Sequence, residues 1–321
     1  MFNKIPTVPR SQELIDKAFS KASKIEEPYY PTMELRVRKE IQDRISVIEG
    51  VAVFNLDRLV KTFPSSDRLH PFYRSLLDMM FDLDKYKISL SKMDKTSRKI
   101  TDLSTQKIRQ LKVITDVREM NARMREYYGR VASLIGDLSD DLNFLSQCRD
   151  YMRKVPQIED TKTFIIAGMP NVGKSSFLSK VTNASPKVAP YPFTTQSIFI
   201  GYLNHMGNRI QLIDTPGILD RPMEKRNKME TNAILALRHI ESTVLFFMDL
   251  SRDALYTKEE QDDLLNEIRS TINSRIIKVQ TKIDISEKKE EKYAISTETG
   301  EGIEDLLNYI KGIKRVDRAA A

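Results

Sequence analysis

The sequence predicts two domains in series: an all-α antiparallel helical bundle, then an α/β domain whose mostly parallel sheet carries helices on both faces. In residues 1–157, apolar side chains recur every three or four positions, which is the spacing of one helix face. After this region, short apolar runs alternate with helical segments. Gly168–Ser176 joins the first run to a helical segment through a glycine-rich turn. We therefore expect the bundle at residues 1–157, the α/β domain at 158–318 and a tail at 319–321.

The bundle is expected to consist of long helices with short joints. A short helix is predicted at Ser11–Lys24, and a regular apolar stripe predicts a long one over residues 32–60. Pro71 can open the next helix, because the first turn does not need the N–H that proline lacks. The remaining expected elements are a long segment over 72–128, interrupted near Asp82 and Thr101, and a last stripe over 131–152.

The α/β domain is expected to begin after Val155-Pro156-Gln157. Each apolar run beyond that point has the length of a strand, and the segments between runs are helical. The expected strands are Thr163–Ala167, Ile198–Leu203, Ile210–Ile213, Thr243–Asp249, Ile276–Gln280 and Tyr293–Ile295.

The composition is that of a globular protein, with 40% apolar and 30% charged residues. The single cysteine, Cys148, excludes an intramolecular disulfide framework and fits a reducing compartment. The first residues lack the continuous apolar segment of a secretory signal, and no run of about 18 apolar residues could span a membrane. We therefore expect a cytoplasmic monomer with no membrane partner.

The excess positive charge lies ahead of the glycine-rich turn. Residues 1–157 hold 29 Lys and Arg against 22 Asp and Glu, which accounts for the whole net charge of +7. A basic domain beside a neutral one suggests an anionic partner, RNA first, although an ordinary helical surface can have the same charge. The cations are densest at Lys85–Arg130, where Tyr86, Tyr127 and Tyr128 either stack on bases or belong to the core.

The glycine-rich turn has the pattern of a phosphate-binding loop. Its sequence, GMPNVGKSS, contains G-x-x-x-x-G-K-S between an apolar run and a helical segment. The backbone N–H groups of residues 168–173 and the helix N-terminus can surround a polyphosphate. Lys174 can reach the β- and γ-phosphates, and the Ser175 hydroxyl can hold Mg²⁺. The turn therefore predicts nucleotide binding.

Two further segments can serve the phosphate end of a nucleotide. Asp214-Thr215-Pro216-Gly217 closes an expected strand, so that Asp214 can hold Mg²⁺ through water and the Gly217 N–H can bind a γ-phosphate. In Tyr191-Pro192-Phe193-Thr194-Thr195, a threonine can place its hydroxyl on Mg²⁺ and its N–H on the γ-phosphate. Thr194 and Thr195 are both candidates, and we prefer Thr195.

Two other segments can recognise the base. In Thr281-Lys282-Ile283-Asp284, the Asp284 carboxylate can accept hydrogen bonds from the N1–H and the exocyclic amine of guanine. Adenine lacks that pair of donors, so the carboxylate selects GTP over ATP. The Lys282 stem can cover the face of the base, and backbone N–H groups of Ser296 and Thr297 can complete the pocket.

The segments GMPNVGKS, FTT, DTPG, TKID and IST, in this order, resemble a translation-factor-class GTPase with the α/β P-loop GTPase fold. YPFTT followed by DTPGILDRP resembles the Obg-like branch. With FPSSDRLHPFYRSLLD, DKYKISL and YGRVASLIGDLSDDLNFL, the chain resembles the Nog-type nucleolar GTP-binding proteins from residue 4 to residue 310. The resemblance implies a GTPase that uses GTP, GDP and Mg²⁺ in large ribosomal subunit assembly, with rRNA, the subunit precursor and ribosomal proteins as partners. Because the chain ends shortly after the GTPase domain, the shorter archaeal type is expected.

The motifs and this resemblance give the following site residues. The nucleotide-binding residues are Gly168, Met169, Pro170, Asn171, Val172, Gly173, Lys174, Ser175, Ser176, Asp214, Gly217, Thr281, Lys282, Asp284, Ser296 and Thr297. The metal-binding residues are Ser175, Thr195 and Asp214. The residues expected to act in hydrolysis are Lys174, Thr195, Gly217 and Asn171.

The sequence departs from the family pattern at several points. Thr281 replaces the usual asparagine, which lowers the expected nucleotide affinity, and Thr297 replaces an alanine beside the base. The helix normally found between Asp284 and Ser296 must be a stump or absent, because the interval is short. Ile218 stands where other GTPases place a glutamine that orients the attacking water, so intrinsic hydrolysis should be slow. In several relatives, an asparagine at the position of Asn171 helps to bind K⁺ against the phosphates.

Three functions fit these observations. The first is a GTP-hydrolysing switch, in which bound GTP holds Thr195 and Gly217 and hydrolysis releases them. The second is an assembly scaffold that binds nucleotide with negligible turnover, as Ile218 allows. The third is a membrane-associated GTPase, against which the lack of an exposed apolar stretch argues.

Overall fold

The computed structural model of the chain describes residues 2–27, 29–155, 157–182, 187–190, 197–220 and 234–312. The chain forms two compact units. One comprises Met1–Leu69 and Met80–Arg153, and the other comprises His70–Met79 and Lys154–Ala321. The described architecture confirms the predicted class, a helical domain followed by an α/β domain with a mostly parallel sheet.

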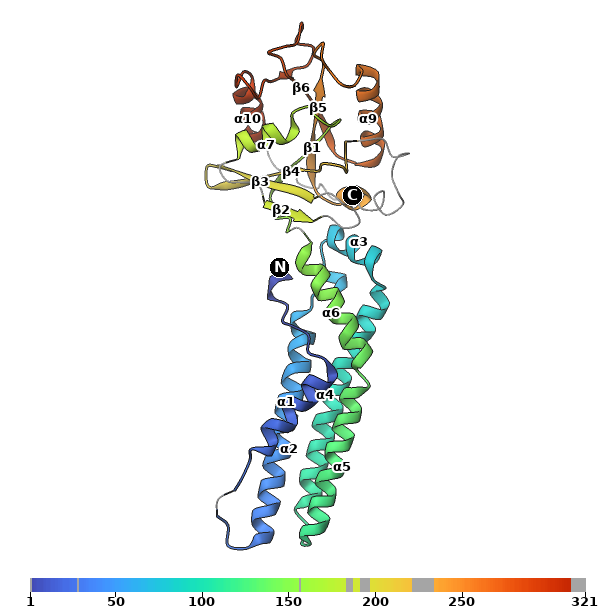
Figure 1. The fold of residues 1–321 in the computed structure, drawn as a ribbon, viewed down its shortest axis with the longest axis vertical. Coiled ribbons are helices and arrows are strands. Elements are labelled where there is room, and N and C mark those ends of the chain that lie inside the picture. The colour runs from blue at the N-terminus through green and yellow to red at the C-terminus, as the bar shows by residue number, and fades with distance from the viewer. Residues whose placement is uncertain are drawn as a thin grey trace. The chain divides into compact units, whose positions relative to one another are not determined.

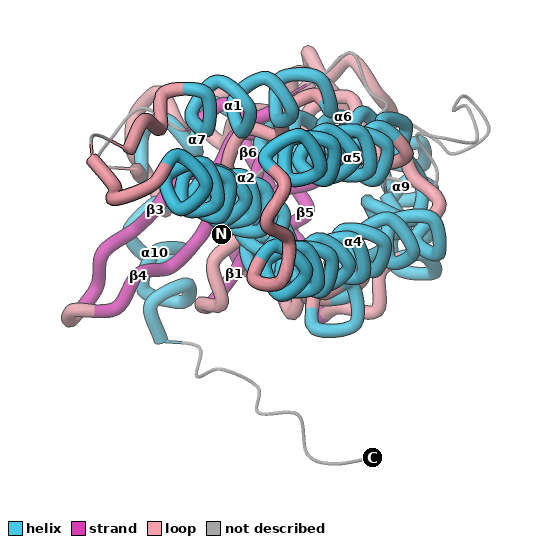
Figure 2. The backbone as a smooth tube through the Cα atoms, turned by 90° about the horizontal axis from the view of Figure 1, so that it is seen from below, coloured by secondary structure: helices cyan, strands magenta, loops and turns pink. Residues whose placement is uncertain are grey.

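The first unit is helical, and α1, α2, α4 and α5 run side by side in it (Figures 1 and 2). Short 3₁₀ turns lie at Phe2–Lys4 and Ser66–Arg68. The α-helices of this unit are α1 (Ser11–Ser23), α2 (Met33–Thr62), α4 (Leu83–Leu111), α5 (Val117–Gly136) and α6 (Ser139–Lys154).

Side-chain caps explain where the long helices begin. The Thr32 side chain accepts a hydrogen bond from the Leu35 N–H at the start of α2, and Asp82 and Asp116 cap α4 and α5 in the same way. The predicted interruption near Asp82 is therefore confirmed. The one predicted near Thr101 is wrong, because Thr101 lies inside α4, whose buried stripe continues through Leu103.

The apolar stripes seen in the sequence form the bundle core. The buried side chains of α2 are Ile41, Ile45, Ile48, Ala52, Leu56 and Leu59, which is the predicted face. Cys148 is fully buried on α6, and burial raises the pKa of its thiol to about 12. Cys148 is therefore a core side chain with no reactive thiolate at neutral pH.

The tyrosines of the basic segment belong mainly to the core. Tyr86 is buried and donates its hydroxyl hydrogen to the Pro64 carbonyl at 2.7 Å. Tyr127 is fully buried, its hydroxyl lies 2.8 Å from that of Ser104, and burial raises its pKa to about 12. Tyr128 is half-buried and packs edge-on against Phe19. Of the two interpretations left open, the structure supports the core for these residues.

Among the described residues, the second unit contains a seven-stranded sheet in the order β2-β3-β4-β1-β5-β6-β7. β1 pairs in parallel with β4 and β5, and β6 pairs in parallel with β5 and β7, while β2–β3 and β3–β4 are antiparallel. The strands are β1 (Lys162–Ala167), β2 (Lys187–Pro190), β3 (Ser197–His205), β4 (Asn208–Asp214), β5 (Ser242–Asp249), β6 (Arg275–Thr281) and β7 (Tyr293–Ala294). Six of them confirm the predicted runs. The edge strand β2 was missed, because it is only four residues long and ends in proline.

Helices cover both faces of this sheet. Figure 1 shows α7 (Lys174–Val181) and α10 (Ile303–Gly312) on one side and α9 (Lys258–Thr271) on the other. Because the central strands are parallel, the carboxyl ends of β1, β4, β5 and β6 meet at one edge. Ligands of open α/β sheets bind at that edge.

Helix α3 (Pro71–Met80), placed in the bundle by the sequence, falls almost wholly in the unit of the sheet. The Tyr73 hydroxyl accepts a hydrogen bond from the Ile158 N–H at 2.7 Å and donates to the Ile158 carbonyl at 3.3 Å. The boundary between residues 157 and 158 stays a prediction.

Candidate nucleotide site

The loop between β1 and α7 has a backbone that requires glycine at two points. Gly168 has φ of 134°, and a Cβ at this position would collide with the Phe247 carbonyl oxygen of β5. Gly173, directly before α7, is left-handed with φ of 90°. Asn171 is exposed and also left-handed, with φ of 61°, a conformation that asparagine tolerates better than most residues. The chain can therefore turn tightly from strand to helix and direct the first N–H groups of α7 into the loop.

Lys174 spans the interior of this loop. Its side chain is buried, and its ammonium donates to the Gly168 carbonyl at 2.8 Å and to the Met169 carbonyl at 2.7 Å. Burial lowers the pKa of Lys174, while the negative charges of Asp214 and Asp220 oppose that shift. A cation thus lies inside the loop, where the phosphates of a nucleotide would bring negative charge.

Ser175 and Asp214 are joined directly at the ends of α7 and β4. The Ser175 hydroxyl donates to Asp214 Oδ2 at 2.7 Å. Asp214 is fully buried, and its other oxygen, Oδ1, has no hydrogen-bond partner among the described residues. Burial raises the pKa of Asp214, against the hydrogen bond from Ser175 and the charge of Lys174. A buried carboxylate oxygen without a partner beside a hydroxyl is a donor set that suits Mg²⁺, which takes oxygen ligands from one or two side chains and from phosphates. These residues fit the ion that the motif implies.

The orphaned oxygen of Asp214 predicts a stability effect. Asp214→Asn should raise the free energy of unfolding of the nucleotide-free protein by about 1 kcal/mol, because a neutral amide costs less to bury than a carboxylate. The same variant should lose the Mg²⁺ dependence of nucleotide affinity. Urea denaturation without Mg²⁺ measures the first effect, and calorimetry with and without Mg²⁺ measures the second.

Asp249 provides the contrasting variant for that measurement. It is also buried, but hydrogen bonds from Lys282 and Ser251 outweigh the effect of burial and lower its pKa. Asp249→Asn should therefore destabilise the protein. An Asp214→Asn variant that unfolds as readily as Asp249→Asn would contradict the explanation.

The backbone N–H of Gly217 is already bonded. It donates to Asp220 Oδ2 at 2.7 Å, and Gly217 itself is left-handed with φ of 73°. Sequence reasoning placed this N–H on a γ-phosphate and did not consider Asp220. The only signal for this contact in the sequence is an acidic residue three positions after the glycine.

Asp284 lies in a tight turn after β6. The Ile285 N–H donates to the Lys282 carbonyl at 3.1 Å, and Lys282 is left-handed with φ of 54°. The Asp284 side chain is exposed, as the recognition of a base requires. Lys282, expected to cover the base, pairs its ammonium with Asp249 Oδ2 at 2.6 Å, which leaves its methylene stem for that contact. The buried Thr281 hydroxyl donates to the Met248 carbonyl at 3.0 Å and so joins the ends of β6 and β5.

The Ser296 segment is arranged differently from the expectation. The Ser296 N–H, expected to face the base, donates to the Glu301 carbonyl at 2.9 Å. The buried Ser296 hydroxyl accepts the N–H groups of Glu298 and Thr299 at 3.2 and 3.1 Å. The Thr297 carbonyl accepts the Lys180 ammonium of α7 at 2.6 Å. Sequence reasoning missed Lys180. This hydrogen bond connects α7, the helix that follows the phosphate loop, to the segment expected to lie beside the base.

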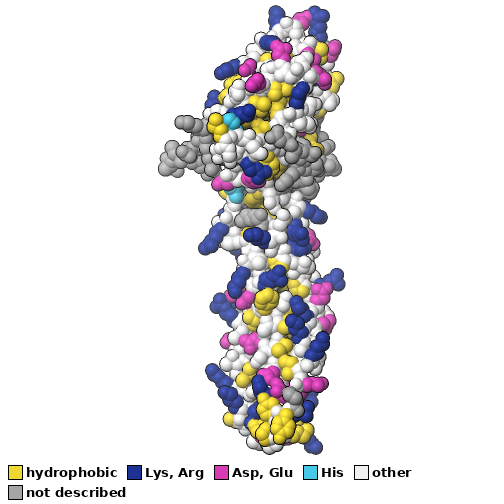
Figure 3. All heavy atoms as spheres, turned by 90° about the vertical axis from the view of Figure 1, so that its left-hand side faces the viewer, with side chains coloured by type: hydrophobic (Ala, Val, Ile, Leu, Met, Phe, Trp, Pro, Cys, Tyr) yellow, Lys and Arg dark blue, Asp and Glu magenta, His cyan; other side chains and the backbone are white. Residues whose placement is uncertain are grey.

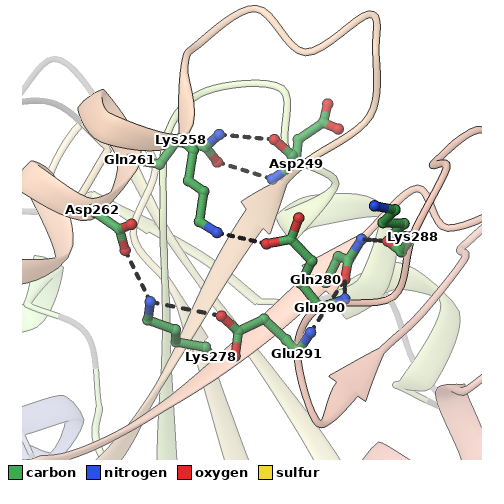
Figure 4. Close-up of polar contacts among 9 residues, drawn as sticks. All are labelled: Asp249, Lys258, Gln261, Asp262, Lys278, Gln280, Lys288, Glu290 and Glu291. Atoms are coloured by element: carbon green, nitrogen blue, oxygen red, sulfur yellow. Dashed lines mark hydrogen bonds and ion pairs between the residues drawn. The ribbon is translucent and has the colours of Figure 1, made fainter.

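Two buried glutamines hold the loops beside the base segments (Figure 4). The Gln261 amide bonds the Asp249 N–H at 2.9 Å and the Asp249 carbonyl at 2.8 Å. The Gln280 amide donates to the Lys288 carbonyl and accepts the Glu290 N–H, both at 2.7 Å. Residues 282–292 form no helix, so of the two predicted alternatives, a stump or no helix, the structure shows the second. The glutamines order this irregular segment in its place.

The described structure joins the residues of the phosphate end through direct hydrogen bonds. Lys174 contacts Gly168 and Met169, and Ser175 contacts Asp214. Thr194 and Thr195 lie outside the described residues, as does the tail at 319–321, so these assignments stay predictions. Sequence reasoning missed Asp220, Lys180, Gln261 and Gln280.

Comparisons with known proteins match both parts of the chain. Residues 2–159 match the family described as the NOG1 N-terminal helical domain, and residues 163–282 match the family described as 50S ribosome-binding GTPase. Nucleolar GTP-binding protein 1 of Encephalitozoon cuniculi is 35% identical over 88% of this chain and 54% of that protein. The protein of the same name from Saccharomyces cerevisiae is 34% identical over 88% of this chain and 44% of its own length. The chain thus spans about half the length of these curated relatives.

Among solved structures, the putative nucleolar GTP-binding protein 1 of Plasmodium falciparum is 35% identical to this chain. The match covers 49% of this chain and 88% of that one, with a TM-score of 0.44.

The relatives' names correct one expectation. They are nucleolar proteins, which contradicts the cytoplasmic location predicted from the sequence. That prediction was wrong because the missing signal and the missing apolar run concern insertion into or passage across a bilayer, and they do not distinguish the cytoplasm from the nucleus, which proteins enter without crossing a bilayer. The two matched regions and the arrangement of the phosphate loop lead to the same assignment. The chain belongs to the nucleolar GTP-binding protein 1 family, with a helical N-terminal domain joined to a P-loop GTPase domain.

Proposed function

We propose that this chain binds GTP and GDP with Mg²⁺, hydrolyses GTP slowly and acts as a switch in assembly of the large ribosomal subunit. The observation that carries the proposal is the Lys174 ammonium inside the loop beside the joined pair Ser175 and Asp214. A bound Mg²⁺ would neutralise charge on the β- and γ-phosphates. The description of the second matched family, which names 50S ribosome binding, supports the ribosomal part.

Calorimetry of the purified chain tests the nucleotide part. GDP and a nonhydrolysable GTP analogue should bind in the presence of Mg²⁺, and ADP and an ATP analogue should bind far more weakly. Equal affinities for guanine and adenine nucleotides would overturn the proposal.

Slow turnover follows from Ile218, whose side chain is apolar and buried. It cannot orient the attacking water as a glutamine does. The same residue favours a second candidate function, a scaffold that binds nucleotide without turning it over. Single-turnover hydrolysis with and without ribosomal particles separates the two, because only the switch should hydrolyse GTP faster on the particle.

We predict that potassium stimulates hydrolysis through Asn171. The side chain is exposed on the loop, where it can meet a cation from solvent. We expect about tenfold faster hydrolysis in KCl than in NaCl, well below the effect of an arginine finger. Asn171→Ala should remove the difference. Equal rates of the unmodified protein in the two salts would contradict the prediction.

We propose that the helical unit contacts RNA through exposed Lys and Arg side chains that form no ion pair within the described residues. Figure 3 shows Lys and Arg side chains interspersed with acids along this unit. In the described part of the chain, no ion pair involves the exposed cations Lys95, Lys99, Arg109, Lys112, Arg118 and Arg125. Lys107 is buried and pairs with Glu126 at 2.7 Å, so it is removed from the candidate set.

Replacing Lys95, Lys99 and Arg109 together by alanine should weaken RNA binding. The dependence of log affinity on log salt concentration should become shallower by about 0.7 for each phosphate that the variant no longer neutralises. The matched control replaces Lys87, Arg98 and Arg123, which are already paired with carboxylates, and should have a smaller effect. Equally weakened binding in both triple variants would count against the assignment.

For the third candidate function, we note only that no helix within the described ranges is long and apolar enough to cross a bilayer. Cosedimentation with liposomes tests membrane association directly.

A further inference from the structure

Asp220 holds the backbone N–H of Gly217, the donor expected from the sequence to bind a γ-phosphate. The Gly217 N–H carries a single hydrogen, and Asp220 Oδ2 accepts it at 2.7 Å. A hydrogen bond to an ionised carboxylate is roughly twice as strong as one between neutral groups. A γ-phosphate oxygen can therefore take this N–H only after the carboxylate releases it.

The Asp220 carboxylate also lies in the electrostatic field of the phosphate site. Its negative charge offsets part of the fall in the pKa of Lys174 that burial causes, and it adds to the rise in the pKa of Asp214. A carboxylate and a γ-phosphate are both anions that accept hydrogen bonds, so they would repel each other at close range. The carboxylate therefore takes a hydrogen-bond donor that the γ-phosphate could use, and its negative charge repels the γ-phosphate.

The backbone around Asp220 is held by other contacts. The Gly168 N–H donates to the Leu219 carbonyl at 3.1 Å, and the Thr215 carbonyl accepts the N–H groups of Ile218 and Leu219. The side chains of Ile218 and Leu219 are buried. Rotation of the Asp220 side chain is thus enough to free the Gly217 N–H, with the turn before it left in place.

We propose that the Asp220 carboxylate competes with the γ-phosphate of GTP for the Gly217 N–H, and so lowers the affinity for GTP relative to GDP. GDP has no γ-phosphate and leaves the bond between Asp220 and Gly217 intact. GTP has to displace the carboxylate, which couples occupancy of the γ-phosphate position to a movement of Asp220. This inference rests on the proposed nucleotide site and assigns to it a residue that discriminates between the two states.

Affinities of GDP and of the GTP analogue GppNHp, measured with Mg²⁺ by calorimetry, test the proposal. The quantity of interest is the ratio of the two dissociation constants, because effects of the substitution on the guanosine and on the α- and β-phosphates, which both nucleotides share, largely cancel in it. In Asp220→Ala, the affinity for GppNHp should rise relative to GDP by about tenfold, the lower end of what a hydrogen bond to a charged group contributes. Asp220→Asn keeps an acceptor of the same size without the charge, so its ratio should lie between those of the unmodified protein and Asp220→Ala.

The control variant is Asp253→Asn, which alters an exposed carboxylate of the same unit and should leave the ratio unchanged. GDP binding by each variant shows that the site is folded. An unchanged ratio in Asp220→Ala, or weaker GppNHp binding, would overturn the inference while leaving the nucleotide site standing. Slower single-turnover hydrolysis with an unchanged ratio would do the same and would assign Asp220 to the attacking water. Failure of the unmodified protein to prefer guanine nucleotides is a different result, and it would overturn the proposed function instead.

Discussion

Lys174→Ala is expected to weaken nucleotide binding by about 100-fold or more. The ammonium is the one cation inside the phosphate loop in the described structure, held by the Gly168 and Met169 carbonyls at 2.8 and 2.7 Å. When a polyphosphate binds, this group can exchange the two carbonyls for β- and γ-phosphate oxygens. Two hydrogen bonds between charged groups contribute about 1.5 kcal/mol each at the least, which corresponds to that decrease in affinity.

Calorimetry with GDP and Mg²⁺ measures the effect, and circular dichroism checks the fold of the variant. Lys292→Ala is the matched control, because Lys292 is an exposed lysine of the same unit on the face of Tyr293. If Lys174→Ala reduced the affinity for GDP by less than about tenfold, Lys174 would only stabilise the loop through its hydrogen bonds to the Gly168 and Met169 carbonyls.

Asp284→Asn is expected to lose guanine recognition and to gain recognition of xanthine. The carboxylate can accept from two donors of guanine, whereas an amide offers one acceptor and one donor group. The amide keeps one of the two hydrogen bonds, so the mismatch should reduce GDP affinity by about tenfold or more, since the bond to a charged group that is lost contributes about 1.5 kcal/mol or more. Xanthine carries a carbonyl where guanine carries its exocyclic amine, so the amide can donate to it.

Fluorescence competition with GDP and XDP measures both effects in one experiment. Because the variant should regain affinity for XDP, a general loss of fold cannot produce the same result. Asp262→Asn serves as the control, since that residue pairs with Lys278 at 2.9 Å on the α9 side and should leave both affinities unchanged. A variant that binds GDP and XDP equally weakly would mean that Asp284 does not read the base.

The parts of the molecule that the sequence predicts are those governed by periodic patterns or by short motifs. The stripe from Ile41 to Leu59 predicts the buried face of α2, and six apolar runs predict six of the seven strands. The G-x-x-x-x-G-K-S pattern predicts the tight turn between β1 and α7, because glycine at positions 168 and 173 is required by the backbone itself. The motif therefore predicts the backbone of this turn, because the two glycines that define the motif are also the residues that the backbone conformation requires.

The features that the sequence did not predict depend on contacts between segments without a shared pattern. Lys180 reaches the Thr297 carbonyl from a residue more than 100 positions away, which no local pattern records. Asp220 and Gln280 act through bonds to backbone groups, and such bonds can be made by many polar residues. Helix α3 was assigned to the bundle because its position in the chain suggested this, whereas its Tyr73 bonds the backbone at Ile158.

The loops beside the base segments are ordered by the neutral amides of Gln261 and Gln280, and pairs such as Lys258 and Glu290 lie at the surface around them (Figure 4). Dissolved ions screen exposed charges over a Debye length of about 10 Å at 0.1 M, but they do not weaken a buried hydrogen bond between neutral groups. The hydrogen bonds that these two glutamines make beside the base segments should therefore be independent of ionic strength. By contrast, the affinity of the helical unit for a polyanion should fall steeply as the ionic strength rises. A concentrated electrolyte wash would accordingly release the chain from the nucleic-acid partner proposed for it, while the loops proposed to bind guanine keep their form.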